Sequence, residues 1–409
     1  MDNLTHTLIG VLVGDTAARS GSTTQGSLPA NIRRSIFIWV MAIGSNLPDA
    51  DLAYSLISRD KLDYLSQHRG YTHTVIGALL AGLLILIVCE FWLRRKHLAP
   101  SWEDRTWIIA LALLAPLLHL AMDTTNSYGV HPFWPFYNGW VYGDAVFIIE
   151  PLFWAAAAPL LFTLRTRLAR SVVGLALAGG VILSAGTGLV PPALCAVLVT
   201  LTIAMLALGR ALAPRRALLA GVVAWLVITG IFIAASEHAV QRVVDYATER
   251  FPQAKLLDHT LSPMPVNPLC WEVILAQSEN EHYVLRRAML SLAPRLLPAA
   301  QCPGRILDQQ ITAPLTEVAD AGAADWQWHG ELVMRRDALK QLASNYCEAA
   351  VFLQFARDPW VLLRAGHWLL GDLRFDREPE LGFAELQLQD GKPCPLAPPW
   401  IPPRADLLR

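Results

Sequence analysis

Residues 106–131 read TWIIALALLAPLLHLAMDTTNSYGVH, and this stretch decides how the whole chain is interpreted. From Thr106 to Leu118 it carries no charged side chain, which is typical of a helix in a lipid bilayer. It then places His119, Asp123 and His131 at its end. Polar and charged groups at the edge of the hydrocarbon are costly and tend to mark function. The stretch therefore predicts a membrane helix that ends in a polar site.

The composition extends this interpretation to much of the chain. The 409 residues are 54% hydrophobic and 16% charged, whereas a soluble domain is typically about 25% charged. Apolar residues form long blocks up to about residue 236, and the sequence is then mixed and polar. We therefore predict a multi-span α-helical membrane domain followed by a small soluble α+β domain with a modest antiparallel sheet. The net charge of −1 gives no indication of nucleic-acid binding.

A bilayer-spanning helix needs about 20 residues. The apolar segments predict about eight such helices, of which the first two are short. Their approximate bounds are 4–18, 33–46, 73–93, 106–122, 144–164, 171–188, 193–209 and 217–235. The start of the chain, MDNLTHTLIG, lacks a basic region, so we expect no signal peptide there.

Basic residues orient these helices, because lysine and arginine favour the cytoplasmic side. They concentrate in every second connection, namely at Arg19, Arg33, Arg34, Arg94, Arg95, Lys96, Arg105, Arg165, Arg167, Arg170, Arg210, Arg215 and Arg216. Both termini are then predicted to face outward. In a bacterial inner membrane that side is the periplasm.

The cysteines fit this orientation. Four of the six lie in the predicted soluble domain, at Cys270, Cys302, Cys347 and Cys394. In an oxidising compartment they can form two disulfides, with three possible pairings. The alternative is four unpaired, buried thiols.

Many ionisable residues gather at the predicted outer ends of the helices, although they come from distant parts of the chain. They are His6, Asp49, Asp51, His68, His73, His119, Asp123, His131 and Glu150. His119 and Asp123 are four residues apart and therefore share one helix face. The turn TTNSYG can bring His131 back towards them. We expect Thr72 or a neighbour to cap the next helix, with His73 in its first turn and His68 in the loop.

Imidazoles and carboxylates without a nearby cysteine suit zinc, and also manganese or iron. We predict His6, Asp49, Asp51, His68, His73, His119, Asp123 and His131 as metal ligands, and so many candidates favour two or more ions. Bound metal polarises a phosphoryl oxygen and activates water. Asp49, Asp51 and Glu150 are then candidates for the catalytic base. The alternative for any single histidine is an interfacial residue with no function.

Five blocks of the chain together resemble a known family. They are DNLTHTLIG, SNLPDADL, HRGYTHT, HLAMDTTNSYG and GDAVFIIEP, in this order. They are similar to the signature blocks of the YdjM-like family of bacterial inner-membrane proteins, whose description implies a metal-dependent hydrolase. The third block of that family often reads RG-x-THS, where this chain has Thr74. The resemblance covers roughly residues 1–165 and implies a metal-dependent hydrolase domain there. The apolar pattern and the basic residues add transmembrane helices at 166–236 and a soluble periplasmic domain at 237–409.

The order of the polar residues also has a weaker likeness to zinc-dependent phospholipase C and the P1-type nucleases. Those enzymes use an early histidine, an aspartate, another histidine, a His-x-x-x-Asp pair and a further histidine. They close with a His-x-x-x-Glu pair, whereas Glu150 has no histidine nearby. They also use an N-terminal amine as a ligand, and Met1 lies five residues before His6. The likeness implies phosphoester chemistry and not shared geometry.

These observations predict an inner-membrane, metal-dependent hydrolase with its site at the periplasmic face. A phospholipid or another membrane amphiphile is the expected substrate, because the site opens beside lipid. The alternative is a non-catalytic scaffold with a structural metal, or a transporter that uses the same residues as an ion path. A transporter should carry polar residues through the bilayer, and the predicted spans after residue 152 are nearly free of them.

Overall fold

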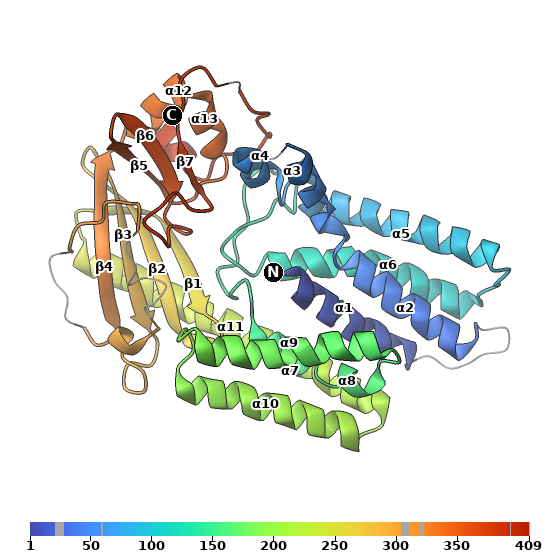
Figure 1. Ribbon diagram of the computed structural model, residues 1–409. Helices are drawn as coiled ribbons and strands as arrows, with labels where there is room; N and C mark the ends of the chain where they lie inside the picture. Colours follow the sequence, from blue (N-terminus) through green and yellow to red (C-terminus); the bar gives the residue numbers. More distant parts are fainter. Residues whose placement is uncertain (21–27, 59, 304–310, 319–322, 393, 409) are drawn as a thin grey trace.

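The computed structural model describes residues 1–409 except 21–27, 59, 304–310, 319–322, 393 and 409 (Figure 1). Helices build the first 250 residues, and antiparallel sheets dominate the rest, as predicted. The helices of the first part are α1 Asn3–Ala18, α2 Ala30–Gly44, α3 Leu52–Ser58, α4 Lys61–Gln67, α5 Val75–Arg95, α6 Trp102–Asp123, α7 Pro151–Ala156, α8 Leu160–Thr163, α9 Arg167–Gly186, α10 Pro192–Ala211 and α11 Pro214–Arg250. Two 3₁₀ turns, η1 Leu47–Asp51 and η2 Tyr71–His73, lie among them.

Within the described ranges, five helices are long and apolar enough to cross a membrane: α5, α6, α9, α10 and α11. The 21 residues of α5 extend about 31 Å, which matches a hydrocarbon core of about 30 Å. Helices α1 and α2, with 16 and 15 residues, are the two short helices that the sequence predicts. They pack against each other, and α1 also contacts α11. The chain is therefore a multi-helix membrane protein.

The predicted fifth span, 144–164, is not one helix. The chain runs as a loop to Glu150 and then forms the short helices α7 and α8. Pro151 occupies the first position of α7. Proline is tolerated there because a backbone N–H at this position has no hydrogen-bonding partner within the helix. Pro159 then separates α7 from α8, because proline cannot donate the hydrogen bond that a continuous helix needs. The two short helices still bury apolar side chains between the long ones, since Phe153 and Leu160 are both in the core.

The second part of the chain is an α+β domain. Strands β1 Lys255–Met264, β2 Asn267–Glu279, β3 His282–Ser291 and β4 Trp326–Arg335 form an antiparallel sheet in that order. Strands β5 Pro359–Arg364, β6 His367–Asp372 and β7 Glu385–Gln387 form a second one. The remaining elements are η3 Ala299–Gln301, α12 Ala338–Asn345, α13 Cys347–Phe352 and α14 Ala405–Leu408. Helix α11 continues out of the membrane domain, and its residues Ala239, Val243 and Ala247 pack against the larger sheet.

The α+β domain lies at the ends of the membrane helices where the polar residues gather (Figure 1). The Arg374 guanidinium donates to the Ser127 carbonyl at 2.7 Å. The Trp140 indole donates to the Gln354 carbonyl at 2.8 Å, and the Trp400 indole donates to the Ser66 carbonyl at 3.3 Å. Segments far apart in the sequence therefore cover the end of α4 and the loop that follows α6.

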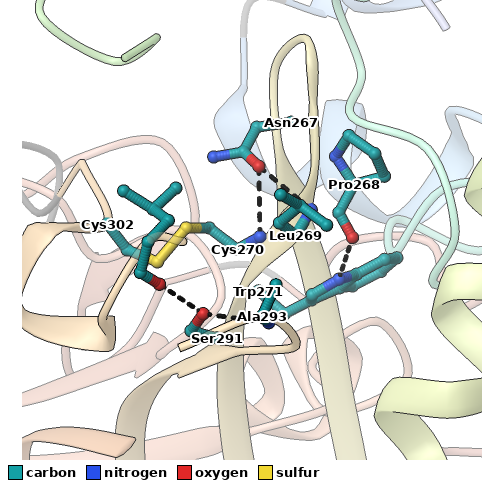
Figure 2. The surroundings of a disulfide bond; sticks show 9 residues. Asn267, Pro268, Leu269, Cys270, Trp271, Ser291, Ala293 and Cys302 are labelled. Atoms are coloured by element: carbon teal, nitrogen blue, oxygen red, sulfur yellow. Dashed lines mark hydrogen bonds between the residues drawn. A yellow bond between two sulfur atoms is a disulfide. The ribbon is translucent and has the colours of Figure 1, made fainter. Parts of the chain in front are cut away.

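The four cysteines of the α+β domain form two disulfides. Cys270 pairs with Cys302, with their Cα atoms 5.8 Å apart (Figure 2). Cys347 pairs with Cys394, with their Cα atoms 5.4 Å apart. The first bridge joins β2 to the segment after η3, and the second joins α13 to the C-terminal segment. Of the three pairings open from the sequence, the structure has this one.

Replacing both Cys347 and Cys394 by serine should lower the free energy of unfolding of this domain by about 2–5 kcal/mol, because the bridge closes a long loop. Thermal unfolding followed by near-UV circular dichroism measures this change. Cys195→Ser is the matched control, since Cys195 forms no disulfide in the described chain. Peptide mapping without reductant should recover both cross-linked pairs, and four free thiols in protein from its native membrane would contradict the assignment.

Candidate metal centre

Four elements meet where the membrane domain adjoins the α+β domain. They are the start of α1, the turns η1 and η2, and the end of α6. The chain's N-terminus lies beside the end of α6 (Figure 1). Each element contributes a buried histidine or aspartate: His6, Asp49, His73, and His119 with Asp123. Sequence positions separated by more than 100 residues are thereby brought to one point.

Local sequence explains how these side chains are placed. His119 and Asp123 stand one turn apart at the end of α6 and face the same way. Pro48 begins η1, the turn that carries Asp49. Thr74, a neighbour of Thr72, caps α5 by accepting a hydrogen bond from the Gly77 N–H. The cap leaves His73 just before the helix, in η2, and not in the first helical turn.

Four atoms from Asp49, His73, His119 and Asp123 converge, and we refer to these residues as the four-residue cluster. The two imidazole Nε2 atoms are 3.0 Å apart. From His73 Nε2 to the Asp49 and Asp123 carboxylates the distances are 3.2 and 3.4 Å. From His119 Nε2 they are 3.5 and 3.4 Å. Ligands about 2.0–2.1 Å from one tetrahedral ion stand about 3.3 Å apart, so the spacing fits a metal.

Hydrogen bonds on the far side of each imidazole turn its Nε2 atom towards this point. His119 Nδ1 donates to the Ser45 carbonyl at 2.8 Å. His73 Nδ1 lies 3.0 Å from the Thr72 hydroxyl and 3.4 Å from the Asp51 carboxylate. A metal-binding imidazole usually has such a partner on its other nitrogen, which fixes the tautomer and the ring orientation.

The carboxylates make this point favourable for positive charge. Burial alone would raise the pKa of Asp49, but hydrogen bonds and charge from His119 and His73 hold it well below its ordinary value. Burial alone would lower the pKa of His73, but the neighbouring carboxylates of Asp123, Asp49 and Asp51 raise it to about 10. The buried Oδ2 atom of Asp123 forms no hydrogen bond with the described part of the chain. A divalent cation would satisfy this oxygen and the negative charge together.

A second group overlaps the first. Asp49, Asp51 and His68 also present atoms close enough to hold a cation, and Asp49 belongs to both groups. His68 Nδ1 lies 3.1 Å from an Asp51 oxygen. The other Asp51 oxygen accepts hydrogen bonds from the Arg69 backbone N–H at 3.0 Å and the Thr72 hydroxyl at 2.9 Å. Asp51 thus organises the loop that carries His68 and His73.

Three further groups lie around Oδ1, the second carboxylate oxygen of Asp123. Its Oδ1 atom lies 3.3 Å from His6 Nε2 and accepts a hydrogen bond from the Met1 amine. The His6 ring stacks on the His119 ring, with centroids 3.8 Å apart. The Arg69 guanidinium also donates to this oxygen at 3.0 Å and lies over the Tyr128 ring. His6 therefore adjoins the four-residue cluster without being one of its members.

Two of the predicted site residues lie elsewhere. His131 belongs to neither group, because its ring is held between the Trp140 and Trp400 rings, each with a centroid 3.9 Å away. Burial lowers the pKa of His131 to about 3, so the imidazole is neutral. The Glu150 carboxylate accepts hydrogen bonds from the backbone N–H groups of Leu152 and Val266. It therefore caps α7 and ties the β1–β2 turn to the membrane domain.

Arg69 lies near the four-residue cluster, although the spacing of residues in the sequence did not predict it as part of the site. It is buried, and its guanidinium donates to Asn126 and Asp123 at 2.9 and 3.0 Å. Its backbone has a positive φ of 59° and precedes Gly70. The sequence did contain an indication of its role, because Arg69 stands between two candidate ligands in HRGYTHT. An arginine that is buried beside a metal site needs carboxylate partners.

The fold and the cluster define a membrane protein whose buried histidines and aspartates can hold a metal ion. The YdjM inner membrane protein family matches residues 1–239, and the chain belongs to this family. The chain is also similar to the uncharacterized protein YfhP of Bacillus subtilis (strain 168), with 30% identity over 141 residues. That alignment covers 34% of this chain and 39% of YfhP, so it spans less than half of either protein. No solved structure matches the chain.

Asp51→Asn should weaken metal binding by about 10–100-fold, because the outer partner of a ligating histidine typically has that effect. The amide is nearly isosteric, so the loop should keep its shape while His73 loses a charged partner. Titration of metal-free protein with zinc and a competing chelator measures the affinity. Asp63→Asn on α4 is the control, since Asp63 belongs to neither metal group. Equal affinities for the two variants would remove Asp51 from the site.

Proposed function

We propose that the protein is a metal-dependent hydrolase of the bacterial inner membrane that acts on a phospholipid or another membrane amphiphile. The observation that carries the proposal is the convergence of two imidazole nitrogens and two carboxylate oxygens, 3.0–3.5 Å apart, at the end of a membrane-spanning helix. Membership of the YdjM inner membrane protein family and the five sequence blocks are consistent with it. Zinc is the favoured ion, with manganese or iron as alternatives.

Each residue near the cluster has a part in this proposal. A divalent ion there would supply Lewis acidity and lower the pKa of a bound water. Asp49, His73, His119 and Asp123 would hold it, and Asp51 would orient His73. Asp51 is also the favoured proton acceptor, because its carboxylate lies beside the cluster, whereas Glu150 caps α7 away from it. Arg69 would keep Oδ1 of Asp123 away from the ion.

The overlapping second group favours two ions over one. Asp49 is shared between the four-residue cluster and the group with Asp51 and His68. If each group held an ion, the pair would stabilise the charge on the attacking and leaving oxygens of a phosphoester. Metal analysis that finds one equivalent at saturation would limit the proposal to a single-ion site.

We place the site and the α+β domain on the periplasmic side. Two disulfides support this side, because they persist in oxidising compartments. The basic residues support it as well, since Arg94 and Arg95 lie at the end of α5 that is remote from the cluster. Protease added to sealed cells with a permeabilised outer membrane should release fragments of the α+β domain.

One observation favours a second candidate, a structural metal site. Four protein ligands around one tetrahedral zinc would leave no open position for water, and closed sites are usually structural. Asp51 and His68 beside the cluster favour the catalytic proposal instead, because they offer groups that a closed site does not need. The two candidates differ in whether a variant that lacks the metal stays folded.

Turnover tests the proposal directly. Protein with and without added zinc or manganese is incubated with vesicles of phosphatidylglycerol and phosphatidylethanolamine, and the release of phosphate-containing head groups and fatty acids is followed by mass spectrometry. We expect products with metal, and none after chelation. Equal turnover by metal-free protein would overturn the proposed mechanism.

A further inference from the structure

The loop that follows α6 exposes several aromatic side chains. Its most exposed ones are Phe133, Phe136 and Tyr137, at 56%, 92% and 52%. They share one compact turn, because the Phe133 carbonyl accepts hydrogen bonds from the N–H groups of Phe136 and Tyr137 at 2.9 and 3.1 Å. We refer to residues 132–138 as the aromatic loop. An exposed apolar patch of this kind marks contact with a membrane or with another protein.

The aromatic loop is joined directly to the start of a membrane-crossing helix. The Pro132 carbonyl accepts a hydrogen bond at 2.9 Å from the N–H of Val75, the first residue of α5. The Tyr71 ring, just before α5, meets the Trp134 ring edge-on, with centroids 5.0 Å apart. These two contacts hold the turn beside the first residues of α5.

The length of α5 gives the depth of this attachment in the bilayer. Its 21 residues extend about 31 Å, and the hydrocarbon core is about 30 Å thick, so Val75 lies at one boundary of the core. Arg94 and Arg95 at the opposite end of α5 then lie at the other boundary. The head-group region beyond each boundary is about 5–8 Å thick. A compact turn that is hydrogen-bonded to Val75 therefore lies in or beside this region.

The lipid-facing surface of α5 continues onto the aromatic loop. Ile76 and Leu80, near the start of the helix, are 38% and 61% exposed. Only 17% of the most apolar stretch of α5 is buried within the protein, and the helix is long and apolar enough to cross the membrane. Its exposed face therefore contacts lipid. This contact reaches the same helical turn that holds the Pro132 carbonyl.

The composition of the loop suits the boundary between lipid and water. The chain contains no aspartate, glutamate, lysine or arginine from residue 124 to residue 143. A partner selected by charge would find no complementary group there. Tyrosine and tryptophan concentrate at the level of the head groups, because their rings are apolar and one edge is polar. Phe133 and Phe136 add apolar area that favours contact with acyl chains.

We propose that the aromatic loop inserts into the interfacial region of the bilayer, in the leaflet on the side of the α+β domain. His73 of the four-residue cluster precedes Val75 by two residues, so their Cα atoms are at most about 7 Å apart. The metal centre then lies at the depth of the lipid head groups, and a lipid reaches it without leaving the bilayer. This last consequence rests on the proposed function, whereas the insertion of the loop does not.

Spin labels on single cysteines measure the depth of the loop directly. Cys89 and Cys195 are first replaced by serine, and the other four cysteines stay in their disulfides. Phe136→Cys and Phe133→Cys then each introduce one labelling site in the loop. Both side chains are exposed, so their replacement should leave the fold intact, and the thermal unfolding midpoint of each labelled protein checks this.

Two control positions calibrate the measurement. Val333→Cys is the aqueous control, because Val333 is 50% exposed on β4, which lies on the far side of the larger sheet from α5 in Figure 1. Leu175→Cys is the lipid control, because Leu175 is 72% exposed on the membrane-crossing helix α9. Each labelled protein is reconstituted in phosphatidylcholine vesicles and, separately, in phosphatidylglycerol vesicles.

Electron paramagnetic resonance then compares collisions of each label with molecular oxygen, which concentrates in lipid, and with a nickel chelate, which stays in water. We expect the ratio of oxygen to nickel collisions at Phe136 and Phe133 to exceed the ratio at Val333 at least about threefold, and to stay below the ratio at Leu175. The ratio should be the same in both lipids, because the loop carries no charge that would recognise an anionic head group.

Three results would overturn the proposal. Ratios at both loop positions equal to the ratio at Val333 would place the loop in water. Labels shielded from both reagents would mean that another protein, or a second copy of the chain, covers the loop. A raised ratio in phosphatidylglycerol vesicles alone would mean that the loop is held by head-group charge and not by its aromatic rings.

The measurement needs neither bound metal nor turnover, so it separates this proposal from the proposed function. Raised ratios at both loop positions, together with no hydrolysis under any metal, would support insertion of the loop and refute the hydrolase. Hydrolysis by a protein whose loop lies in water would have the opposite meaning.

Discussion

His119→Ala should abolish tight metal binding while the protein stays folded. His119 contributes one of the four converging atoms, and its ring has no access to solvent. The loss of a ligand should lower the metal affinity by more than about 100-fold. The loss of a residue that only hydrogen-bonds to a ligand already lowers it by about 10–100-fold. The fold should persist because His73 remains between the carboxylates of Asp49 and Asp123. Hydrolysis should fall to the level of metal-free protein.

Metal content by elemental analysis and a thermal melt in mild detergent are the two measurements. His367→Ala is the control, because His367 lies exposed on β6. A His119→Ala protein that keeps its metal would contradict the assignment of the ligand. A variant that loses its metal and no longer folds would favour the structural metal site instead.

The second large effect concerns Arg357, which joins the two domains. Its buried guanidinium donates to Asp144 at 2.9 Å and to Asp258 at 3.0 Å. Asp144 belongs to the loop before α7, and Asp258 belongs to β1. Arg357→Met should lower the free energy of unfolding by about 3–5 kcal/mol, because it leaves buried carboxylates without a partner. For a domain of this size the midpoint of thermal unfolding should fall by about 6–20 °C.

Differential scanning fluorimetry measures this shift. Arg335→Met is the matched control, because Arg335 pairs with Asp337 on an exposed surface and its loss should change little. The Arg357 variant should also be cut faster by protease between α11 and the sheet, as the domains separate. Equal melting of both variants would mean that the ion pairs at the junction do not hold the domains together.

Local spacing predicted the parts of the site that are close in sequence. The four-residue interval of His119 and Asp123 placed both on one helix face, and the structure brings their ligand atoms to one point. The motif HRGYTHT predicted His73 in the first turn of a helix, whereas the structure places it in η2, just before α5. The long apolar runs predicted the membrane helices, because a bilayer requires about 20 apolar residues whatever the tertiary contacts are.

Residue spacing could not predict the contacts between segments that are distant in the sequence. Nothing in the sequence around His131 shows that Trp400, from the other end of the chain, stacks on it. The Ser45 carbonyl that orients His119 is a backbone atom, and its position depends on how α2 ends. Apolar content alone suggested one helix at 144–164, although Pro159 divides it.

X-ray absorption at the edge of the bound metal, on protein purified gently from its native membrane, tests the central claim most directly. The account predicts a metal surrounded by nitrogen and oxygen at about 2.0–2.1 Å, with the outer-shell scattering of imidazole rings and no sulfur neighbour. Protein that carries no metal, even after zinc or manganese is added back, would contradict it. So would a sulfur neighbour at about 2.3 Å, because no cysteine belongs to the groups described around Asp49.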